Sequence, residues 1–188
     1  MEKYFDIIVR RSVFDKRFIN YNLCLVTDFE MAKVKGKNIV DIVKSSINGG
    51  CSMVQFREKK MDYENKLALA KQIKDVCHNK VPFIINDDVK LAEEIDADGV
   101  HVGQDDMKAG EVRRVIGNNK ILGVTVGNLS ELDKAHQNGA DYLGTDAIFP
   151  TSTKPGKSLG LEKFREITLA SKIPVIGIGG INKTNICN

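Results

Sequence analysis

The sequence predicts an α/β domain of the TIM-type (β/α) barrel class, and three observations support this. Short apolar segments rich in Val and Ile alternate with segments of helical periodicity, a pattern typical of a parallel sheet. The length of 188 residues suits one domain spanning 1–188. No GxGxxG motif follows the first strand, which disfavours a dinucleotide-binding sheet.

Seven strands are expected, each bounded by Gly, Pro or Asp, as strands covered on both faces often are. They lie at residues 23–28, 53–58, 82–87, 99–104, 121–126, 142–149 and 174–179. Helices are expected between them, at 37–49, 62–78, 88–95, 107–116, 129–138 and 161–171. A weak repeat around Cys51, Asp98 and Asp141, with a spacing of 43 to 47 residues, is consistent with paired βα units of a barrel.

Both ends of the sequence depart from a complete barrel. After the seventh strand only GGINKTNICN remains, so we expect a barrel truncated at that point, without its eighth βα unit. Residues 1–20 precede the first strand. They are expected to be either a leader helix beneath the barrel or a loosely held N-terminal extension.

Composition argues against several classes of protein. The net charge of +3 is small and dispersed, which disfavours nucleic acid as the main partner. No apolar run approaches the roughly 20 residues of a membrane span. The four cysteines are far apart and form no CxxC motif, so we expect free thiols and a cytoplasmic location. Small-molecule partners are favoured, and a homo-oligomer is left open.

The second strand carries three polar side chains at alternate positions, Gln55, Arg57 and Lys59. Strand side chains alternate between faces, so these three are expected to point together into the barrel mouth. Inward polar groups are costly unless they meet a ligand or each other, which favours an anion site with Arg57 and Lys59 facing phosphate. The alternative is a solvated face of an edge strand.

Acidic residues follow the third and fourth strands. Asn86 and Asp87 end the third strand, and Asp106 follows the fourth. Neighbouring parallel strands lie about 4.8 Å apart, so Asp87 and Asp106 are expected to converge on one Mg²⁺ ion, which takes one or two carboxylates plus substrate phosphates. The alternative is that Asp87 or Asp88 caps the following helix.

The last three strands end in small or hydroxylic residues. Thr125 ends the fifth strand, and the sixth runs into a loop with Thr151, Ser152, Thr153 and Lys154 between two prolines. These hydroxyls and the ammonium are expected to wrap a phosphate. Gly180 belongs to a glycine-rich turn after the seventh strand, where backbone N–H groups approach a phosphate. An ordinary polar loop and close strand–helix packing are the alternatives.

At these residues the sequence resembles the thiamine-phosphate synthase (thiamine-phosphate pyrophosphorylase) family. The resemblance runs from about Leu23 to Asn185. It is carried by VQFREK, IND, DGVHVGQDD, GVTV, IFPTSTK and IPVIGIGGI, in that order. It implies a (β/α)₈ barrel and an Mg²⁺-dependent transferase. Such an enzyme joins hydroxymethylpyrimidine diphosphate to a thiazole phosphate, which in some cases carries a carboxylate, and releases pyrophosphate.

The resemblance also implies roles for individual residues. The pyrimidine diphosphate would be held by Gln55, Arg57, Lys59 and Asn86, with Thr125 near the pyrimidine where the family usually has serine. Asp87 and Asp106 would bind Mg²⁺. The thiazole phosphate would be held by Thr151, Thr153 and the backbone of Gly180, while Lys154 reaches the pyrophosphate. Arg57, Lys59 and Lys154 would act in catalysis by stabilising the leaving diphosphate.

Other functions are weighed beside this one. A thiazole tautomerase of the same fold would not need the whole TSTK loop or both carboxylates. Phosphate-binding isomerases of tryptophan or histidine biosynthesis would match GIGG but neither VQFREK nor PTSTK. An inactive fragment of a synthase is the third alternative, and the missing eighth unit is its support.

Overall fold

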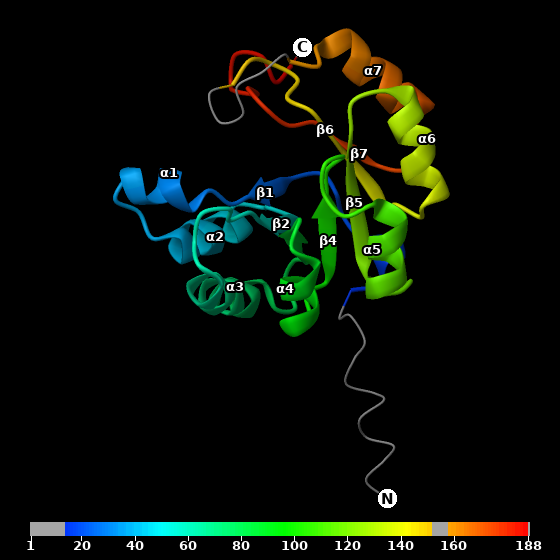
Figure 1. The fold of residues 1–188 in the computed structure, drawn as a ribbon. Helices are drawn as coiled ribbons and strands as arrows, with labels where there is room; N and C mark the ends of the chain where they lie inside the picture. The colour runs from blue at the N-terminus through cyan, green and yellow to red at the C-terminus, as the bar shows by residue number, and fades with distance from the viewer. Residues whose placement is uncertain (1–13, 152–157, 188) are drawn as a thin grey trace, which may run out of the picture. The chain divides into compact units, whose positions relative to one another are not determined.

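The computed structural model describes residues 14–151 and 158–187, and it confirms the alternation of strands and helices (Figure 1). Seven strands follow one another in sequence order in one sheet. Strands β1 to β4 pair in parallel with their neighbours, and so do β5 to β7. The strands are β1 (Cys24–Val26), β2 (Met53–Phe56), β3 (Phe83–Asn86), β4 (Gly99–Val102), β5 (Ile121–Val126), β6 (Tyr142–Thr145) and β7 (Val175–Ile176).

Six of the helices lie within a residue or two of their predicted positions. The helices are α1 (Phe29–Val34), α2 (Ile39–Asn48), α3 (Tyr63–Cys77), α4 (Val89–Glu94), α5 (Ala109–Ile116), α6 (Leu129–Gln137) and α7 (Leu161–Ala170). The short helix α1 was not predicted. Within the described part of the chain, no helix is long and apolar enough to cross a bilayer.

Most of these helices begin at a side chain that replaces a missing backbone acceptor. The first amide groups of a helix have no intrahelical partner, and Asp or Asn side chains supply one. The capping residues are Asp28 for α1, Asn38 for α2, Asp62 for α3, Asp88 for α4 and Asn128 for α6. Each cap lies between a strand and the helix that follows it or, for α2, between two helices. The polar residues after the strands therefore include structural as well as candidate functional groups.

The inner strands β2 to β6 are covered on both faces, as their unbroken apolar sequences predict, whereas β1 and β7 are half-buried. In β2 and β3, successive residues such as Met53 and Val54, or Phe83 and Ile84, are all fully buried. Leu122 in β5 and Leu143 in β6 are equally buried. This packing holds the strands in a fixed register, and the register determines which polar side chains share a face at the strand ends.

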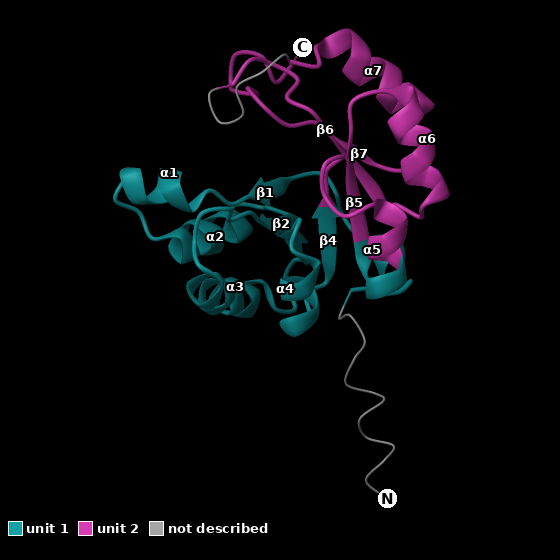
Figure 2. Cartoon of the chain, in the orientation of Figure 1, with its two compact units in different colours: residues 1–101, 114–121 teal, residues 102–113, 122–188 magenta. Residues whose placement is uncertain are grey.

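By its internal contacts the chain divides into two compact units (Figure 2). The first comprises residues 1–101 and 114–121, and the second residues 102–113 and 122–188. The first unit carries β1 to β3 and most of β4, while the second carries β6, β7 and most of β5. The expectation of one domain over 1–188 stays a prediction. Of the N-terminal extension, residues 1–13 lie outside the described residues, and a short 3₁₀ turn occupies Lys16–Phe18.

The weak sequence repeat corresponds to a recurring contact at the start of alternate strands. Just before β2, β4 and β6, a side chain accepts a hydrogen bond. The donor is a backbone amide within the preceding strand or next to it. The three contacts are Leu23 N to Ser52 Oγ at 3.0 Å, Phe83 N to Asp98 Oδ2 at 2.9 Å, and Leu122 N to Asp141 Oδ2 at 2.9 Å. A short polar side chain is therefore required at the same place in successive βα pairs.

Candidate active site

The carboxyl end of β2 presents a polar face in the first unit. Gln55 pairs with Ile84 of β3, and further along the strands Asn86 pairs with His101 of β4. Paired residues of parallel strands project to the same side, and side chains two apart on one strand share a face. Gln55, Asn86 and His101 therefore share one face. Arg57 follows just beyond the end of β2 and is half-buried, and its common direction with Gln55 and Lys59 stays a prediction.

Two residues at this end of the sheet were not singled out from the sequence. His101 is 7% exposed and lies beside Asn86. Thr27, just after β1, is 3% exposed, and its hydroxyl accepts the Arg57 amide at 2.9 Å and donates to the Arg57 carbonyl at 3.4 Å. The signal for both is strand register, which the sequence alone does not supply.

Lys59 contacts one of the two predicted metal ligands. Its Nζ lies 2.8 Å from Oδ2 of Asp87, and the lysine side chain is 54% exposed. The loop that carries Lys59 is held by Glu58, whose Oε1 accepts the amides of Lys60 at 2.7 Å and Met61 at 3.1 Å. The prediction that Lys59 faces phosphate and Asp87 binds Mg²⁺ is not decided by this ion pair and stays a prediction.

The backbone of Asp87 is strained. Its φ is 64°, in the left-handed region that non-glycine residues seldom adopt. The conformation is held by a hydrogen bond from the Asp87 amide to the His101 carbonyl at 2.8 Å and by one from the Asp88 amide to the Asn86 carbonyl at 2.8 Å. Strain of this kind is retained where the surrounding structure fixes it, commonly at functional sites.

Asp88, rather than Asp87, caps the following helix. Its Oδ1 accepts the Leu91 amide at 3.0 Å, and its other oxygen binds the Lys66 ammonium. Burial alone would raise the pKa of the Asp88 carboxyl. The net pKa is nevertheless below its ordinary value of 3.8, because hydrogen bonds from Lys66 and Leu91 and the charges of Lys66 and Lys90 outweigh burial. The capping alternative therefore applies to Asp88, and Asp87 is left for another role.

In the second unit, Asp106 closes a tight turn after β4. Its Oδ2 accepts the Gly103 amide at 2.8 Å, and the side chain is half-buried. Gln104, in the same turn, donates from Nε2 to the carbonyl of Thr125 at 2.6 Å. This bond connects the turn to the end of β5, where Thr125 is half-buried.

The loop after β6 has a closed base. Beyond the strand, the amides of Ile148 and Phe149 donate to the carbonyls of Ile178 and Gly179 at 2.9 and 3.0 Å. On the return of the chain, Leu159 N donates to the Ala147 carbonyl at 2.7 Å. The predicted phosphate loop therefore departs from and rejoins the same short segment. Thr151 at its start is half-buried, and Ser152, Thr153 and Lys154 lie outside the described residues.

Gly180 lies against this base. Its φ is 70°, and a Cβ placed there would lie 2.7 Å from the carbonyl oxygens of both Phe149 and Pro150. Only glycine permits this approach of two backbones. The structure thus brings Gly180 and the start of the loop together, as expected if both hold one phosphate.

The predicted metal ligands, Asp87 and Asp106, offer carboxylate oxygens, which are ligands that Mg²⁺ accepts. In the described part of the chain, no three His, Cys, Asp or Glu side chains form a group that could hold a metal ion. Mg²⁺ needs only one or two carboxylates, because substrate phosphates and water complete its shell. Asp87 belongs to the first unit and Asp106 to the second. Their convergence, and that of Arg57 and Lys154 with them, stays a prediction.

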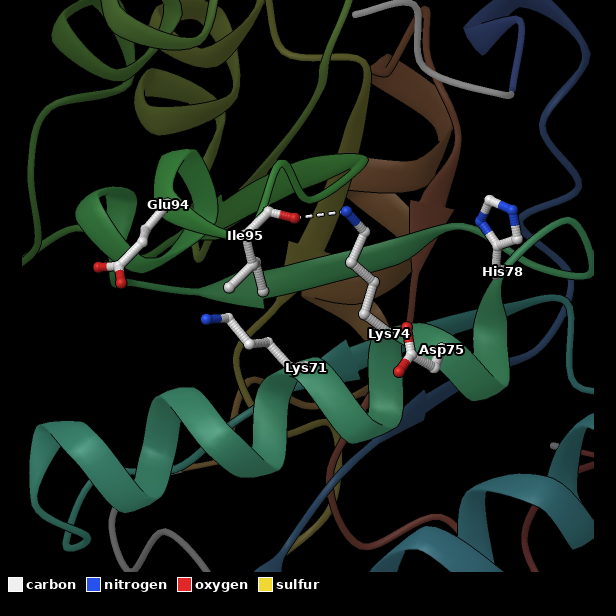
Figure 3. A pocket seen from close by; sticks show the side chains of 6 residues that line it. All are labelled: Lys71, Lys74, Asp75, His78, Glu94 and Ile95. Carbon is white, nitrogen blue, oxygen red and sulfur yellow. Dashed lines mark hydrogen bonds between the residues drawn. The ribbon is translucent and has the colours of Figure 1, made fainter. Parts of the chain in front are cut away.

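A surface depression of about 430 Å³ lies elsewhere in the first unit (Figure 3). Its lining comes from the last turns of α3 and α4, and in it the Lys74 ammonium donates to the carbonyl of Ile95. Helices of βα units run back toward the amino ends of the strands, so this depression lies at the edge opposite the predicted site. The lining residues are Lys71, Lys74, Asp75, His78, Glu94 and Ile95.

Comparison with known proteins identifies the family of this chain. A family model described as thiamine monophosphate synthase matches residues 23–188. A thiamine-phosphate synthase of Clostridium botulinum is 44% identical over 170 residues, which cover 89% of this chain and 82% of that protein. One from Methanosarcina mazei is 45% identical over 163 residues, covering 86% and 67%.

A solved structure gives the same result in three dimensions. The thiamine phosphate pyrophosphorylase of Pyrococcus furiosus superimposes with a TM-score of 0.76 at 35% sequence identity, covering 87% of this chain and 77% of that one. The predicted TIM-type fold class is thereby confirmed. On its sequence, its fold and the matched length, this chain belongs to the thiamine monophosphate synthase family.

Proposed function

We propose that this protein condenses 4-amino-2-methyl-5-hydroxymethylpyrimidine diphosphate with a thiazole phosphate, giving thiamine phosphate and pyrophosphate. The relatives that match most of the chain support the reaction. The structural observation that carries the proposal is the approach of Lys59 to Asp87 beyond the end of the strand face that bears Gln55 and Asn86. Cations beside a carboxylate with a strained backbone are suited to a metal-bound diphosphate.

The pyrimidine diphosphate is assigned to the first unit. Gln55 and Asn86 bind it from the polar strand face, and Arg57 and Lys59 pair with its phosphate oxygens. As the pyrimidine C–O bond breaks, its electron pair leaves with the diphosphate. The positive charges of Arg57 and Lys59, joined by Lys154, stabilise that developing charge. When bound at Asp87 and Asp106, Mg²⁺ neutralises further charge on the leaving group.

The thiazole phosphate is assigned to the second unit. Thr151, Ser152 and Thr153 offer hydroxyl groups, and the backbone at Gly180 offers N–H groups. Thr125 supplies a hydroxyl near the pyrimidine. Held in place, the thiazole nitrogen attacks the pyrimidine-methyl cation left by bond cleavage. The protein's contribution at this step is positioning, because no protein nucleophile is required.

The proposal includes small-molecule substrates as partners and a cytoplasmic location. The four cysteines are free thiols, as is usual in a reducing compartment.

A coupling assay tests the proposal. Purified protein receives both substrates and Mg²⁺, thiamine phosphate is quantified by fluorescence after oxidation, and circular dichroism is recorded on the same sample. We expect product formation that stops when Mg²⁺ is chelated. Asp87→Ala and Asp106→Ala should lower Mg²⁺-dependent turnover with an unchanged spectrum, whereas Asp41→Ala on exposed α2 should not. A folded wild-type chain without product would contradict the proposal.

Lys154 is tested in the same assay. Lys154→Ala should lower kcat by at least about tenfold, in line with the effect of removing a group that stabilises a developing negative charge. An unchanged kcat would remove Lys154 from its catalytic role.

A further inference from the structure

Asp87 and Asp88 are neighbouring carboxylates that each pair with their own lysine, and the two pairs differ. Lys66, on α3, is 17% exposed and binds the carboxylate that caps α4. Lys59, in the loop after β2, is 54% exposed and binds Asp87, which makes no helix cap. The first pair is built into the packing of α3 against α4. The second pair has an exposed lysine, and an exposed ion pair contributes little to stability.

We propose that Lys59 acts as a placeholder for the metal on Asp87, so that the site accepts Mg²⁺ together with a diphosphate and disfavours Mg²⁺ alone. The inference rests on the proposed function, since it takes Asp87 as a metal ligand. The Lys59 ammonium lies 2.8 Å from Oδ2 of Asp87. An Mg²⁺ ion that binds this oxygen must displace the ammonium.

Charge balance explains why the diphosphate changes the outcome. An Mg²⁺ ion that arrives alone leaves Lys59 without its carboxylate and places a dication beside it. An Mg²⁺ ion that arrives with a diphosphate brings anionic oxygens to which Lys59 and Arg57 can transfer. The exchange then replaces one charge-assisted contact of Lys59 by another.

The backbone supports an exchange by side-chain movement alone. Asp87 is held at a φ of 64° by hydrogen bonds of its own and the next amide, so its backbone does not depend on Lys59 for its conformation. Glu58 fixes the loop of Lys59 through the amides of Lys60 and Met61. The lysine side chain is therefore the adjustable part, and its ammonium needs only to rotate from carboxylate to phosphate.

Two binding measurements test the inference without relying on turnover. The affinity for free Mn²⁺, used in place of Mg²⁺, is measured by electron paramagnetic resonance at low ionic strength, where exposed pairs are least screened. The affinity for preformed magnesium pyrophosphate is measured by calorimetry. The test variants are Lys59→Gln and Asp87→Asn. Lys66→Gln is the control, because it removes the same charge beside the adjacent carboxylate of Asp88.

For Lys59→Gln we expect opposite shifts. Free Mn²⁺ should bind about two- to fivefold tighter, the range expected for loss of an exposed ion pair, and magnesium pyrophosphate should bind at least that much more weakly. Lys66→Gln should change neither affinity by more than about a factor of two. Asp87→Asn should weaken both.

The contradicting outcomes separate this inference from the proposed function. If Asp87→Asn weakens both ligands but Lys59→Gln leaves free Mn²⁺ affinity unchanged or lowers it, the placeholder role is wrong and the metal assignment stands. If Lys66→Gln raises the affinity for Mn²⁺ as much as Lys59→Gln does, the change in affinity comes from the loss of any nearby positive charge. The placeholder role of Lys59 is then again wrong. If Asp87→Asn alters neither ligand, the metal assignment fails and the inference fails with it.

Discussion

The hydroxyl of Thr27 binds both backbone groups of Arg57, accepting its amide at 2.9 Å and donating to its carbonyl at 3.4 Å. Thr27 also donates its own amide to the Gln55 carbonyl at 2.9 Å. One buried threonine thereby continues the β1–β2 pairing beyond the last strand residue. It sets the point at which the backbone of Arg57 leaves the sheet, and we expect this to position the guanidinium.

Thr27→Val tests this positioning role. The shape is nearly kept, but the Arg57 amide loses its acceptor, so the free energy of unfolding should fall by about 1 kcal/mol in urea titrations. The affinity for magnesium pyrophosphate should fall by more than that of a control, Thr168→Val, whose hydroxyl bonds only within exposed α7. Equal pyrophosphate affinities in the two variants would show that Thr27 has a structural role alone.

Gly180→Ala tests the contact between the last glycine turn and the base of the loop. The new Cβ would lie 2.7 Å from backbone oxygens of Phe149 and Pro150, so one segment must move. We expect KM for the thiazole phosphate to rise several-fold more than KM for the pyrimidine diphosphate. Gly36→Ala is the matched control, because its φ is also positive, at 62°, and its Cβ would meet nothing within 4 Å. A parallel loss in both variants would refute the assignment.

Asp141→Ala tests the recurring contact at strand starts. Asp141 Oδ2 accepts Leu122 N at 2.9 Å and Arg113 Nη2 at 2.6 Å, and the two side chains of the ion pair are only 16% and 12% exposed. Removing the acid leaves a buried guanidinium, so the free energy of unfolding should fall by about 3 kcal/mol. The double variant Arg113→Leu/Asp141→Ala should recover part of this loss. A double variant as unstable as the sum of both singles would exclude the ion pair as the cause.

Asp88 makes stability depend on pH in a known direction. Burial raises its pKa, but Lys66 and the Leu91 amide outweigh this, so the pKa lies below 3.8 in the folded protein. A carboxyl whose pKa is lower in the folded than in the unfolded protein stabilises the folded state. This stabilisation is complete at pH values above the unfolded pKa, and it is lost as the pH falls through the folded pKa. The stability difference between wild type and Asp88→Asn, which keeps a capping side chain, should therefore shrink below about pH 4. A difference constant with pH would contradict this.

The order of strands and helices could be predicted because each has a strong local signal. Apolar segments bounded by Gly, Pro or Asp located all seven strands. Helix α1 was missed because, among its six residues, only Ala32 is buried while Val34 is 87% exposed, so no apolar periodicity marks it. The predicted sixth strand continued to 149, whereas β6 ends at Thr145. Beyond it the amides of Ile148 and Phe149 still bond to the segment after β7.

The site was less predictable because it depends on relations between strands. The pattern Gln55, Arg57 and Lys59 located one polar face, and the acids after β3 suggested a metal ligand. The sequence left Asp87 and Asp88 as equal candidates for a helix cap, since the distinction lies in the backbone conformation of Asp87. His101 and Thr27 were missed because their neighbours come from other strands, at distances along the chain that only the register defines.

The base of the loop after β6 is closed by main-chain atoms alone. The Leu159 amide donates to the Ala147 carbonyl, and the amides of Ile148 and Phe149 donate to the segment after β7. Backbone bonds of this kind do not depend on the identity of the side chains. We therefore expect the base to keep these bonds through most substitutions at its own residues, whereas proline at Ile148, Phe149 or Leu159 would remove a donor and open it.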